Sequence, residues 1–296
     1  ELATFGTPDK MAKVKKYLDK IVTHKPVLEV NNFEDFNSLN IDCPNFKEVS
    51  KFYKGSFVLN NSKYLFDKEY HAPTPILLLG EPGIGKTHFA KRLAKILGTS
   101  FHFLDANSIT ASWVLTGSSG QWQNADAGNI FKYILDSNTV SPVVILDEID
   151  KLSQGKNYDP FSVFHQIFEP ENASHFKDEF LNFTFDASKI IYILTANNVN
   201  NIPESLLSRM RVFNIERPNL DEMKLIAQNI YKEIVGNSPL LKSKLSEHVL
   251  DKLVSLPPRD IKKQISNAVF NQLAENQDYD QDLSLDVEKI SKNWGF

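Results

Sequence analysis

The sequence predicts a three-layer α/β/α domain with a five-stranded parallel sheet, followed by a small α-helical lid domain. Two observations carry this prediction. Between residues 75 and 217, five short runs of aliphatic and β-branched residues alternate with helical patterns, and after Pro218 only helical patterns remain. Fully apolar strands that are separated by helices are typical of a parallel sheet covered on both faces.

The chain divides into three expected regions: an N-terminal helical segment over residues 1–40, the α/β/α domain over 41–217 and the lid over 218–296. Apolar residues recur with a helical period from Met11 to Val22, and Asn45 to Tyr53 has a similar pattern after an Asn- and Asp-rich connection. The expected strands are Ile76–Leu79, Phe101–Leu104, Val143–Leu146, Ile190–Leu194 and Val212–Ile215. The expected lid helices are Leu220–Val235, Leu245–Leu256, Arg259–Ala274 and Leu285–Ile290.

Composition excludes several classes of function. The 296 residues are 42% hydrophobic and 24% charged, with a formal net charge of −4, so no global basic field draws the protein to nucleic acid, although a local basic patch stays open. Cys43 is the only cysteine, which excludes a disulfide framework and a thiolate zinc site. No apolar run approaches the roughly 20 residues that span a membrane, and no secretory signal pattern is found. We therefore expect a soluble, cytoplasmic protein.

A glycine-rich loop follows the first expected strand and precedes a helical run. It reads G-E-P-G-I-G-K-T and satisfies the pattern G-x-x-x-x-G-K-[ST] in its required context, so the domain is expected to be a P-loop NTPase domain. Its backbone N–H groups would surround phosphates, Lys86 would reach the β- and γ-phosphates, and Thr87 would bind Mg²⁺. The alternative is a chance match in an ordinary strand–turn–helix. The residues expected to bind ATP here are Gly80, Glu81, Pro82, Gly83, Ile84, Gly85, Lys86, Thr87 and His88.

Two carboxylates end a later apolar run. Asp147 and Glu148 follow four apolar residues, which places them at the carboxyl end of a strand, where open α/β sheets bind ligands. Asp147 suits the Mg²⁺ shell, and Glu148 is placed to orient and deprotonate the attacking water. A charged turn after a buried strand is the alternative for this pair taken by itself.

Residues further along distinguish among the groups of phosphate-loop ATPases. The strand expected at 190–194 leads into Thr-Ala-Asn-Asn, and the run Ile202 to Met210 reads I-P-E-S-L-L-S-R-M. This run resembles the I-P-x-x-L-L-x-R-M segment of the ATPase module of Lon protease, a member of the AAA+ class. The resemblance implies that Asn197 is sensor 1, which helps to place the attacking water. It also implies that Arg209 is the arginine finger that acts on the neighbouring subunit's nucleotide.

The resemblance to Lon covers most of residues 75–217 and continues into the lid. Gly117 to Ile130 keeps the spacing of the pore-loop region of Lon, which implies that Trp122 grips substrate. The loop around Trp122 is rich in glycine and serine, a composition that predicts mobility. In the lid, a helix that begins after two prolines carries Arg259, which the resemblance implies to be sensor 2.

The resemblance also implies a mode of assembly, and two functions stay open. An arginine finger that acts in trans requires a homo-oligomer, and the expectation for the family is a hexameric ring, with ATP and Mg²⁺ as cofactors. One function is an ATP-driven motor that remodels or threads a polypeptide for a separate effector protein. The other is an ATP-controlled switch or scaffold, for example in a defence or DNA-transaction system, without threading. The chain stops after the lid and offers no Ser–Lys dyad, so we expect no protease activity from it.

Overall fold

The computed structural model describes residues 8–21, 25–67, 70–152, 159–238 and 240–274, together with 283 and 285. The chain forms two compact units, and each unit is built from segments that are separate in the sequence. Unit 1 takes its described residues from Glu1–Phe33, Lys51–Gly80 and Ala90–Asn214, and unit 2 from Glu34–Ser50, Glu81–Phe89 and Ile215–Phe296.

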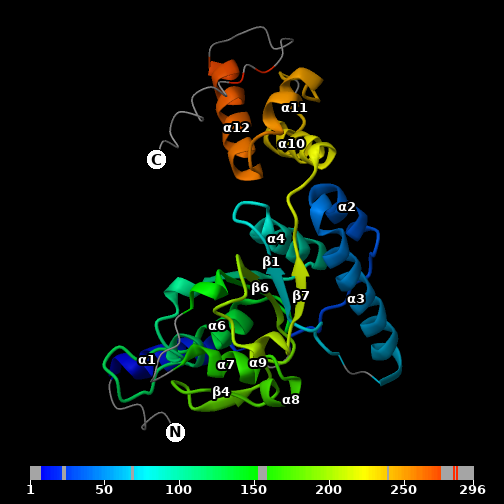
Figure 1. Ribbon diagram of the computed structural model, residues 1–296. Helices are drawn as coiled ribbons and strands as arrows, with labels where there is room; N and C mark the ends of the chain where they lie inside the picture. The colour runs from blue at the N-terminus through cyan, green and yellow to red at the C-terminus, as the bar shows by residue number, and fades with distance from the viewer. Residues whose placement is uncertain are drawn as a thin grey trace. The chain divides into compact units, whose positions relative to one another are not determined.

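A five-stranded parallel sheet forms the centre of unit 1, in the order β2-β3-β6-β1-β7. Figure 1 labels its strands β1, β6 and β7. All four strand pairings are parallel, so the carboxyl ends of the strands meet at one edge of the sheet. The strands are β1 (Ile76–Leu79), β2 (Phe101–Asp105), β3 (Val143–Asp147), β6 (Ile191–Ala196) and β7 (Arg211–Asn214). The predicted sheet is confirmed, and each strand boundary lies within two residues of its expected position.

Both faces of the three central strands, β1, β3 and β6, are largely buried, which explains why these strands are almost entirely apolar. On one face, Leu77, Val144 and Leu194 share a core cluster with residues of the helices α5 (Trp113–Thr116), α6 (Asn129–Asp136) and α7 (Pro160–Ile167). On the other face, residues of the central strands such as Ile76 and Ile145 are also 0% exposed, whereas Phe103 in the edge strand β2 is 48% exposed. The sheet is therefore the middle of three layers, as the sequence predicts.

The helices before the sheet differ from the prediction. Helix α1 (Pro8–Lys20) begins three residues early, and α2 (Asp35–Asp42) occupies part of the stretch that was expected to be a connection. A short 3₁₀ turn (Pro44–Phe46) leads into α3 (Lys47–Asp67), which continues well beyond the expected end at Tyr53. Only two residues of α2 are buried, Phe36 and Leu39, too few to produce a recognisable period.

Long-range contacts account for the unexpected length of α3. Its second half contains two adjacent asparagines, which are poor helix formers. The Asn60 side-chain amide donates to the carbonyl oxygen of His71, and that of Asn61 donates to the carbonyl oxygen of Val30 at 2.8 Å. Tertiary hydrogen bonds thus offset a weak intrinsic helix propensity in this segment.

A second, two-stranded sheet was not predicted. Strands β4 (Phe176–Asp178) and β5 (Phe183–Phe185) pair in antiparallel orientation. Each has three residues, which is too short to show the alternation that identifies a strand. Two one-turn helices, α8 (Pro170–Ala173) and α9 (Glu204–Leu207), complete unit 1.

Unit 2 contains a helical bundle formed by α10 (Leu220–Val235), α11 (Glu247–Leu253) and α12 (Pro258–Ala274) (Figure 1). These helices pack around a core of their own, so the predicted α-helical lid is confirmed. Helix α10 begins at its expected residue because Asn219 and Glu222 form a reciprocal capping box. The helix expected over 285–290 lies outside the described residues, apart from Leu285.

Among the helices of the described part of the chain, none has the length and apolar character that crossing a membrane requires.

Candidate active site

The loop between β1 and α4 (Lys86–Leu97) has the backbone that its sequence predicts. Gly83 and Gly85 have φ angles of +80° and +102°, a left-handed region that favours glycine. Lys86 is 8% exposed, and its Nζ donates to the carbonyl oxygen of Glu81 at 3.1 Å. Two left-handed glycines at the start of a 12-residue helix form a cradle that suits a phosphate, since the helix presents backbone N–H groups there.

Residues that precede the sheet in sequence support this loop within unit 2. The Asn45 side-chain amide donates to the carbonyl oxygens of Ile84 at 3.3 Å and Glu216 at 3.2 Å. The ring of Phe46 stacks on that of Phe89 in α4, with centroids 4.8 Å apart and planes inclined by 12°. These contacts link both sides of the loop to the 3₁₀ turn that leads into α3.

The start of the lid helix α12 also lies next to the loop in unit 2. A Cβ atom placed on Gly83 would come within 3.9 Å of the Cβ of Pro257, two residues before Arg259. Arg259 and His88 are both exposed. Arg259 therefore stands at the beginning of a helix whose first residues are near the loop, and its role as sensor 2 stays a prediction.

In unit 1, Asp147 and Glu148 are joined by a residue that the sequence reading did not identify. The hydroxyl of Thr195 in β6 donates to the Asp147 carboxylate at 2.6 Å and accepts the backbone N–H of Glu148 at 2.9 Å. Thr195 is 1% exposed. Glu148 has a left-handed backbone, with φ +56° and ψ +45°, which costs a non-glycine residue about 1–2 kcal/mol. The hydrogen bond from Thr195 helps to hold this strained turn.

The carboxylate of Glu148 has two further partners. Asn107, just past the end of β2, donates its side-chain amide to Glu148 Oε2 at 3.3 Å, and Lys151 Nζ lies 3.2 Å from the same oxygen. Asn107 is itself held by Asp105, whose Oδ1 accepts its side-chain amide at 2.8 Å. In the sequence, Asn107 is recognisable only as a polar residue two positions beyond the end of a strand. Many asparagines in turns share that feature, so it does not predict a contact with Glu148.

Asn197 lies at the same edge of the sheet as the two carboxylates. It follows β6, which is paired with β3 on one side and β1 on the other. Its backbone N–H donates to the Asp150 carboxylate at 3.3 Å, and the N–H of Gly80 donates to the carbonyl oxygen of Ala196 at 3.1 Å. The ends of β1, β3 and β6 therefore bring Gly80, Asp147 and Asn197 to one edge.

Arg209 is held by its own chain. Its Nε donates to Glu169 Oε1 at 2.7 Å, its Nη2 lies 2.5 Å from the same oxygen, and its Nη1 donates to the carbonyl oxygen of Ser205 at 2.5 Å. The side chain remains 31% exposed. Glu169 therefore fixes the direction of an arginine that still reaches solvent.

The segment that carries Trp122 is anchored at its base, and the mobility expected from its glycine- and serine-rich composition stays a prediction. Buried Asp178 accepts backbone N–H groups from Gly128 at 2.8 Å, Phe180 at 3.0 Å and Leu181 at 2.8 Å. Burial raises the pKa of the Asp178 carboxyl, against the effect of these donors. Gly117 has a φ of +83° and packs against Gly128 and Asp178. The glycines therefore make a close-packed neck between the two ends of the segment.

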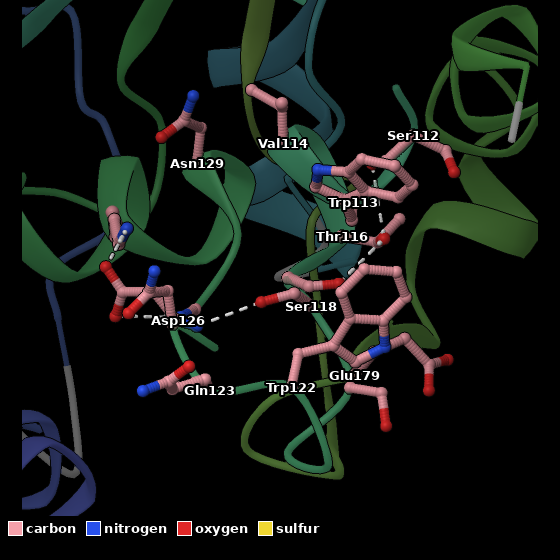
Figure 2. A pocket seen from close by; sticks show the side chains of 15 residues that line it. Ser112, Trp113, Val114, Thr116, Ser118, Trp122, Gln123, Asp126, Asn129 and Glu179 are labelled. Atoms are coloured by element: carbon pink, nitrogen blue, oxygen red, sulfur yellow. Dashed lines mark hydrogen bonds and ion pairs between the residues drawn. The ribbon is translucent and has the colours of Figure 1, made fainter. Parts of the chain in front are cut away.

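Helix α1 braces the same segment from its other side. Tyr17 donates its hydroxyl to Asp126 at 2.7 Å, Lys13 Nζ donates to the carbonyl oxygen of Ala125 at 3.1 Å, and Lys10 Nζ donates to that of Gly120. Burial opposes ionisation of Asp126, but hydrogen bonds from Lys132 and Tyr17 outweigh it and hold the pKa of this carboxyl below its ordinary value. Trp122 itself is 56% exposed, and its ring centroid lies 5.8 Å from that of Trp113 (Figure 2).

The close-packed neck gives a testable difference between two glycines. A Cβ atom on Gly128 would lie 2.1 Å from the carbonyl oxygen of Leu115 and 2.4 Å from the backbone nitrogen of Gly117. We expect Gly128→Ala to lower the free energy of unfolding by about 1–3 kcal/mol or more. Gly55→Ala is the control, because Gly55 is exposed in α3 with nothing within 4 Å, and it should raise stability by about 0.5–1 kcal/mol. Urea unfolding measures the free energy of unfolding of both variants. Equal changes in this free energy would contradict the close packing described around Gly128.

Comparison with known proteins identifies a matching family model and several relatives. Residues 76–217 match the model described as "ATPase family associated with various cellular activities (AAA)". Lon protease of Mycoplasmopsis agalactiae is 28% identical over 231 residues, which are 78% of this chain and 22% of that protein. Lon protease 1 of Bacillus subtilis is 34% identical over 173 residues, 58% of this chain and 22% of that protein. The chain thus spans less than a quarter of the length of these two relatives.

A solved structure shares the fold. The chain of Hsp104 in a reconstruction titled "Closed State CryoEM Reconstruction of Hsp104:ATPyS and FITC casein" matches with a TM-score of 0.66 and 18% sequence identity. The match covers 82% of this chain and 47% of the Hsp104 chain. At this level of identity the likeness concerns the fold.

Proposed function

Because residues 76–217 of this chain are a domain of the AAA family of ATPases, related to the ATPase region of Lon protease, we propose that the protein binds and hydrolyses Mg-ATP. The observation that supports this most is the loop after β1, where two left-handed glycines precede a helix that begins at Lys86. The acidic end of β3 supports the hydrolytic step, because its two carboxylates lie at the sheet edge from which this loop departs.

Each residue has a proposed part in the reaction. Backbone N–H groups of the loop and the Lys86 ammonium bind the phosphates, and Asn197 helps to position the attacking water. Glu148 accepts a proton from that water as it attacks. Asp147 is kept in one orientation by Thr195. Arg209 of a neighbouring copy approaches the phosphate charge that develops in the transition state.

A threonine hydroxyl and an aspartate carboxylate are oxygen ligands of the kind that Mg²⁺ takes in proteins. Thr87 and Asp147 are the residues that would hold Mg²⁺, which neutralises charge on the phosphates when bound. Nowhere in the described ranges do three His, Cys, Asp or Glu side chains gather as a metal site. A magnesium site needs no such cluster here, because Mg²⁺ usually keeps several waters and takes further oxygens from the phosphates.

Binding of ATP can be tested apart from hydrolysis. We expect Lys86→Met to weaken the affinity for a fluorescent ATP analogue by about 100-fold, because it removes a buried cation that faces the phosphates. Lys91→Met, on the same helix, is the matched control and should bind as the unaltered protein does. Fluorescence anisotropy titrations with Mg²⁺ present measure both variants. Unchanged affinity of Lys86→Met would refute the proposed phosphate site.

We further propose that hydrolysis drives remodelling or threading of a polypeptide on behalf of a separate effector, in a homo-oligomeric ring that the family leads us to expect as a hexamer. Support comes from Trp122, a large side chain exposed at the tip of a firmly anchored segment. Tryptophan is enriched at protein interfaces, because its ring combines a large apolar surface with a polar N–H group. The second candidate function, an ATP-controlled switch or scaffold, needs no such contact with substrate.

Trp122 separates these two functions. In the motor, Trp122→Ala should abolish ATP-dependent unfolding of a fluorescent model protein that carries an unstructured tail, because the loop loses its gripping surface. Leu59→Ala removes a similarly exposed apolar side chain, 57% accessible, from α3 and serves as the control. Loss of fluorescence over time measures unfolding. Equal unfolding by both variants would favour the switch.

A further inference from the structure

A pocket of about 700 Å³ lies between the Trp122 segment, α5 and the turn after β4, away from the phosphate loop in sequence (Figure 2). The two indole rings of Trp113 and Trp122 form part of its wall, inclined to each other by 38°. Glu179 also lines the pocket; it lies in the turn after β4, where its backbone N–H donates to the carbonyl oxygen of Thr116 at 2.8 Å. Trp113 and Glu179 belong to no motif that the sequence reading used.

The base of this pocket is preformed. Asp178 ties Gly128 to the turn that carries Glu179, and Tyr17 and Lys132 hold the Asp126 carboxylate at the pocket wall. A site that is already rigid avoids much of the ordering cost that a mobile loop would incur on binding. The pocket therefore has the preorganisation of a binding site, although Trp122 itself stands largely in solvent.

The charges in the pocket favour a cation. Its lining contains two carboxylates, Asp126 and Glu179, and one ammonium, Lys132, which sum to a formal charge of −1. Lys132 pairs with Asp126 at 2.9 Å. Glu179 lies 3.5 Å from Lys177, but the two side chains are 50% and 46% exposed, and so exposed a pair is worth little. Glu179 is thus the carboxylate that an incoming charge would meet.

Aromatic rings and a carboxylate together recognise one kind of side chain. The faces of indole rings carry negative electrostatic potential and attract ammonium and guanidinium groups. The same faces, together with Glu179, repel a carboxylate. We propose that this pocket binds a lysine or arginine side chain of an extended polypeptide, with its alkyl stem against Trp113 and Trp122 and its charge toward Glu179. This inference rests on the proposed function, in which the protein acts on polypeptides, and it specifies which side chains of such a polypeptide the pocket binds.

The chain offers a direct optical test, because its three tryptophans are Trp113, Trp122 and Trp294. In a Trp294→Phe protein, all indole fluorescence comes from the two rings of the pocket. Blocked Gly/Ser hexapeptides with one central lysine, norleucine, arginine, citrulline or glutamate would be titrated against the full chain, with and without an ATP analogue. Norleucine keeps the four-carbon stem of lysine without the ammonium group, and citrulline keeps the shape of arginine without the charge.

We expect the lysine and arginine peptides to bind about five- to tenfold more tightly than their neutral counterparts, and the glutamate peptide to bind most weakly. Glu179→Gln should reduce the ratio of affinities for charged and neutral peptides to about twofold or less. Glu171→Gln is the control, because it changes an exposed carboxylate outside the pocket lining. This variant should keep the full difference in affinity between charged and neutral peptides. Added salt should lower the affinity for the lysine peptide more than the affinity for the norleucine peptide.

Three results would overturn the inference: equal affinity for charged and neutral peptides, a preference that survives Glu179→Gln, or no binding of any peptide. Binding and hydrolysis of ATP, measured on the same protein, keep this failure distinct from that of the proposed function. If the protein hydrolyses ATP but binds charged and neutral peptides equally, only the proposed preference for lysine and arginine side chains is rejected. If ATP does not bind, the proposed function fails whatever the peptides do.

Discussion

Glu148→Gln is expected to lower ATP turnover by about 10²- to 10⁴-fold, with ATP affinity changed by no more than a few-fold. The amide cannot accept the proton of the attacking water, but it keeps the size of the carboxylate. The strained turn at this residue is held by the Thr195 hydroxyl through the backbone N–H, which the substitution leaves in place. Loss of activity would therefore reflect chemistry and not a displaced strand end.

Two measurements define this result. Phosphate release gives turnover, and anisotropy of a fluorescent ATP analogue gives affinity. Glu171→Gln makes the same chemical change at an exposed position of α8 and should hydrolyse ATP at the unaltered rate. Turnover of Glu148→Gln within threefold of the unaltered protein would remove Glu148 from the role of base. The variant also serves as a trap, since a form that binds ATP without hydrolysing it should retain its substrate and partner in a pull-down.

Arg209→Ala is expected to reduce turnover by about 10³-fold or more while ATP still binds, the effect that removal of an arginine finger produces. The side chain is partly exposed and is directed by Glu169 and the carbonyl of Ser205. Its loss leaves Glu169 at a position where water can solvate it, so we expect little change in stability. Arg211→Ala is the matched control, because Arg211 lies over the rings of Phe52 and Phe213 instead.

Action in trans predicts that two inactive variants restore each other. When Arg209→Ala and Glu148→Gln proteins are mixed, a subunit with an intact Glu148 can receive Arg209 from a neighbour that carries the other substitution. Turnover should then rise well above the sum of the separate variants and depend on total protein concentration. A mixture that remains inactive, although each variant still assembles and binds ATP, would contradict an arginine finger in trans. Full turnover by Arg209→Ala would remove Arg209 from the site altogether.

The sequence alone was sufficient for the sheet, the first three lid helices and the backbone of the glycine-rich loop. Runs such as Val143–Leu146 are apolar because both of their faces are buried, and that burial is readable residue by residue. The loop is equally readable, because the left-handed backbone at Gly83 and Gly85 favours glycine, which therefore marks the turn. Such features depend on local conformation or on burial that repeats with a fixed period.

Only the tertiary structure decided which polar side chains meet. Thr195 lies 48 residues from its partner Asp147, and Glu169 lies 40 residues from Arg209, so no local pattern announces either pair. The contacts of α1 with the Trp122 segment span more than 100 residues and brace a loop whose composition by itself predicts mobility. A hydrogen bond depends on where two distant segments are brought together, and that position is set by the packing of the whole unit rather than by the residues beside each partner.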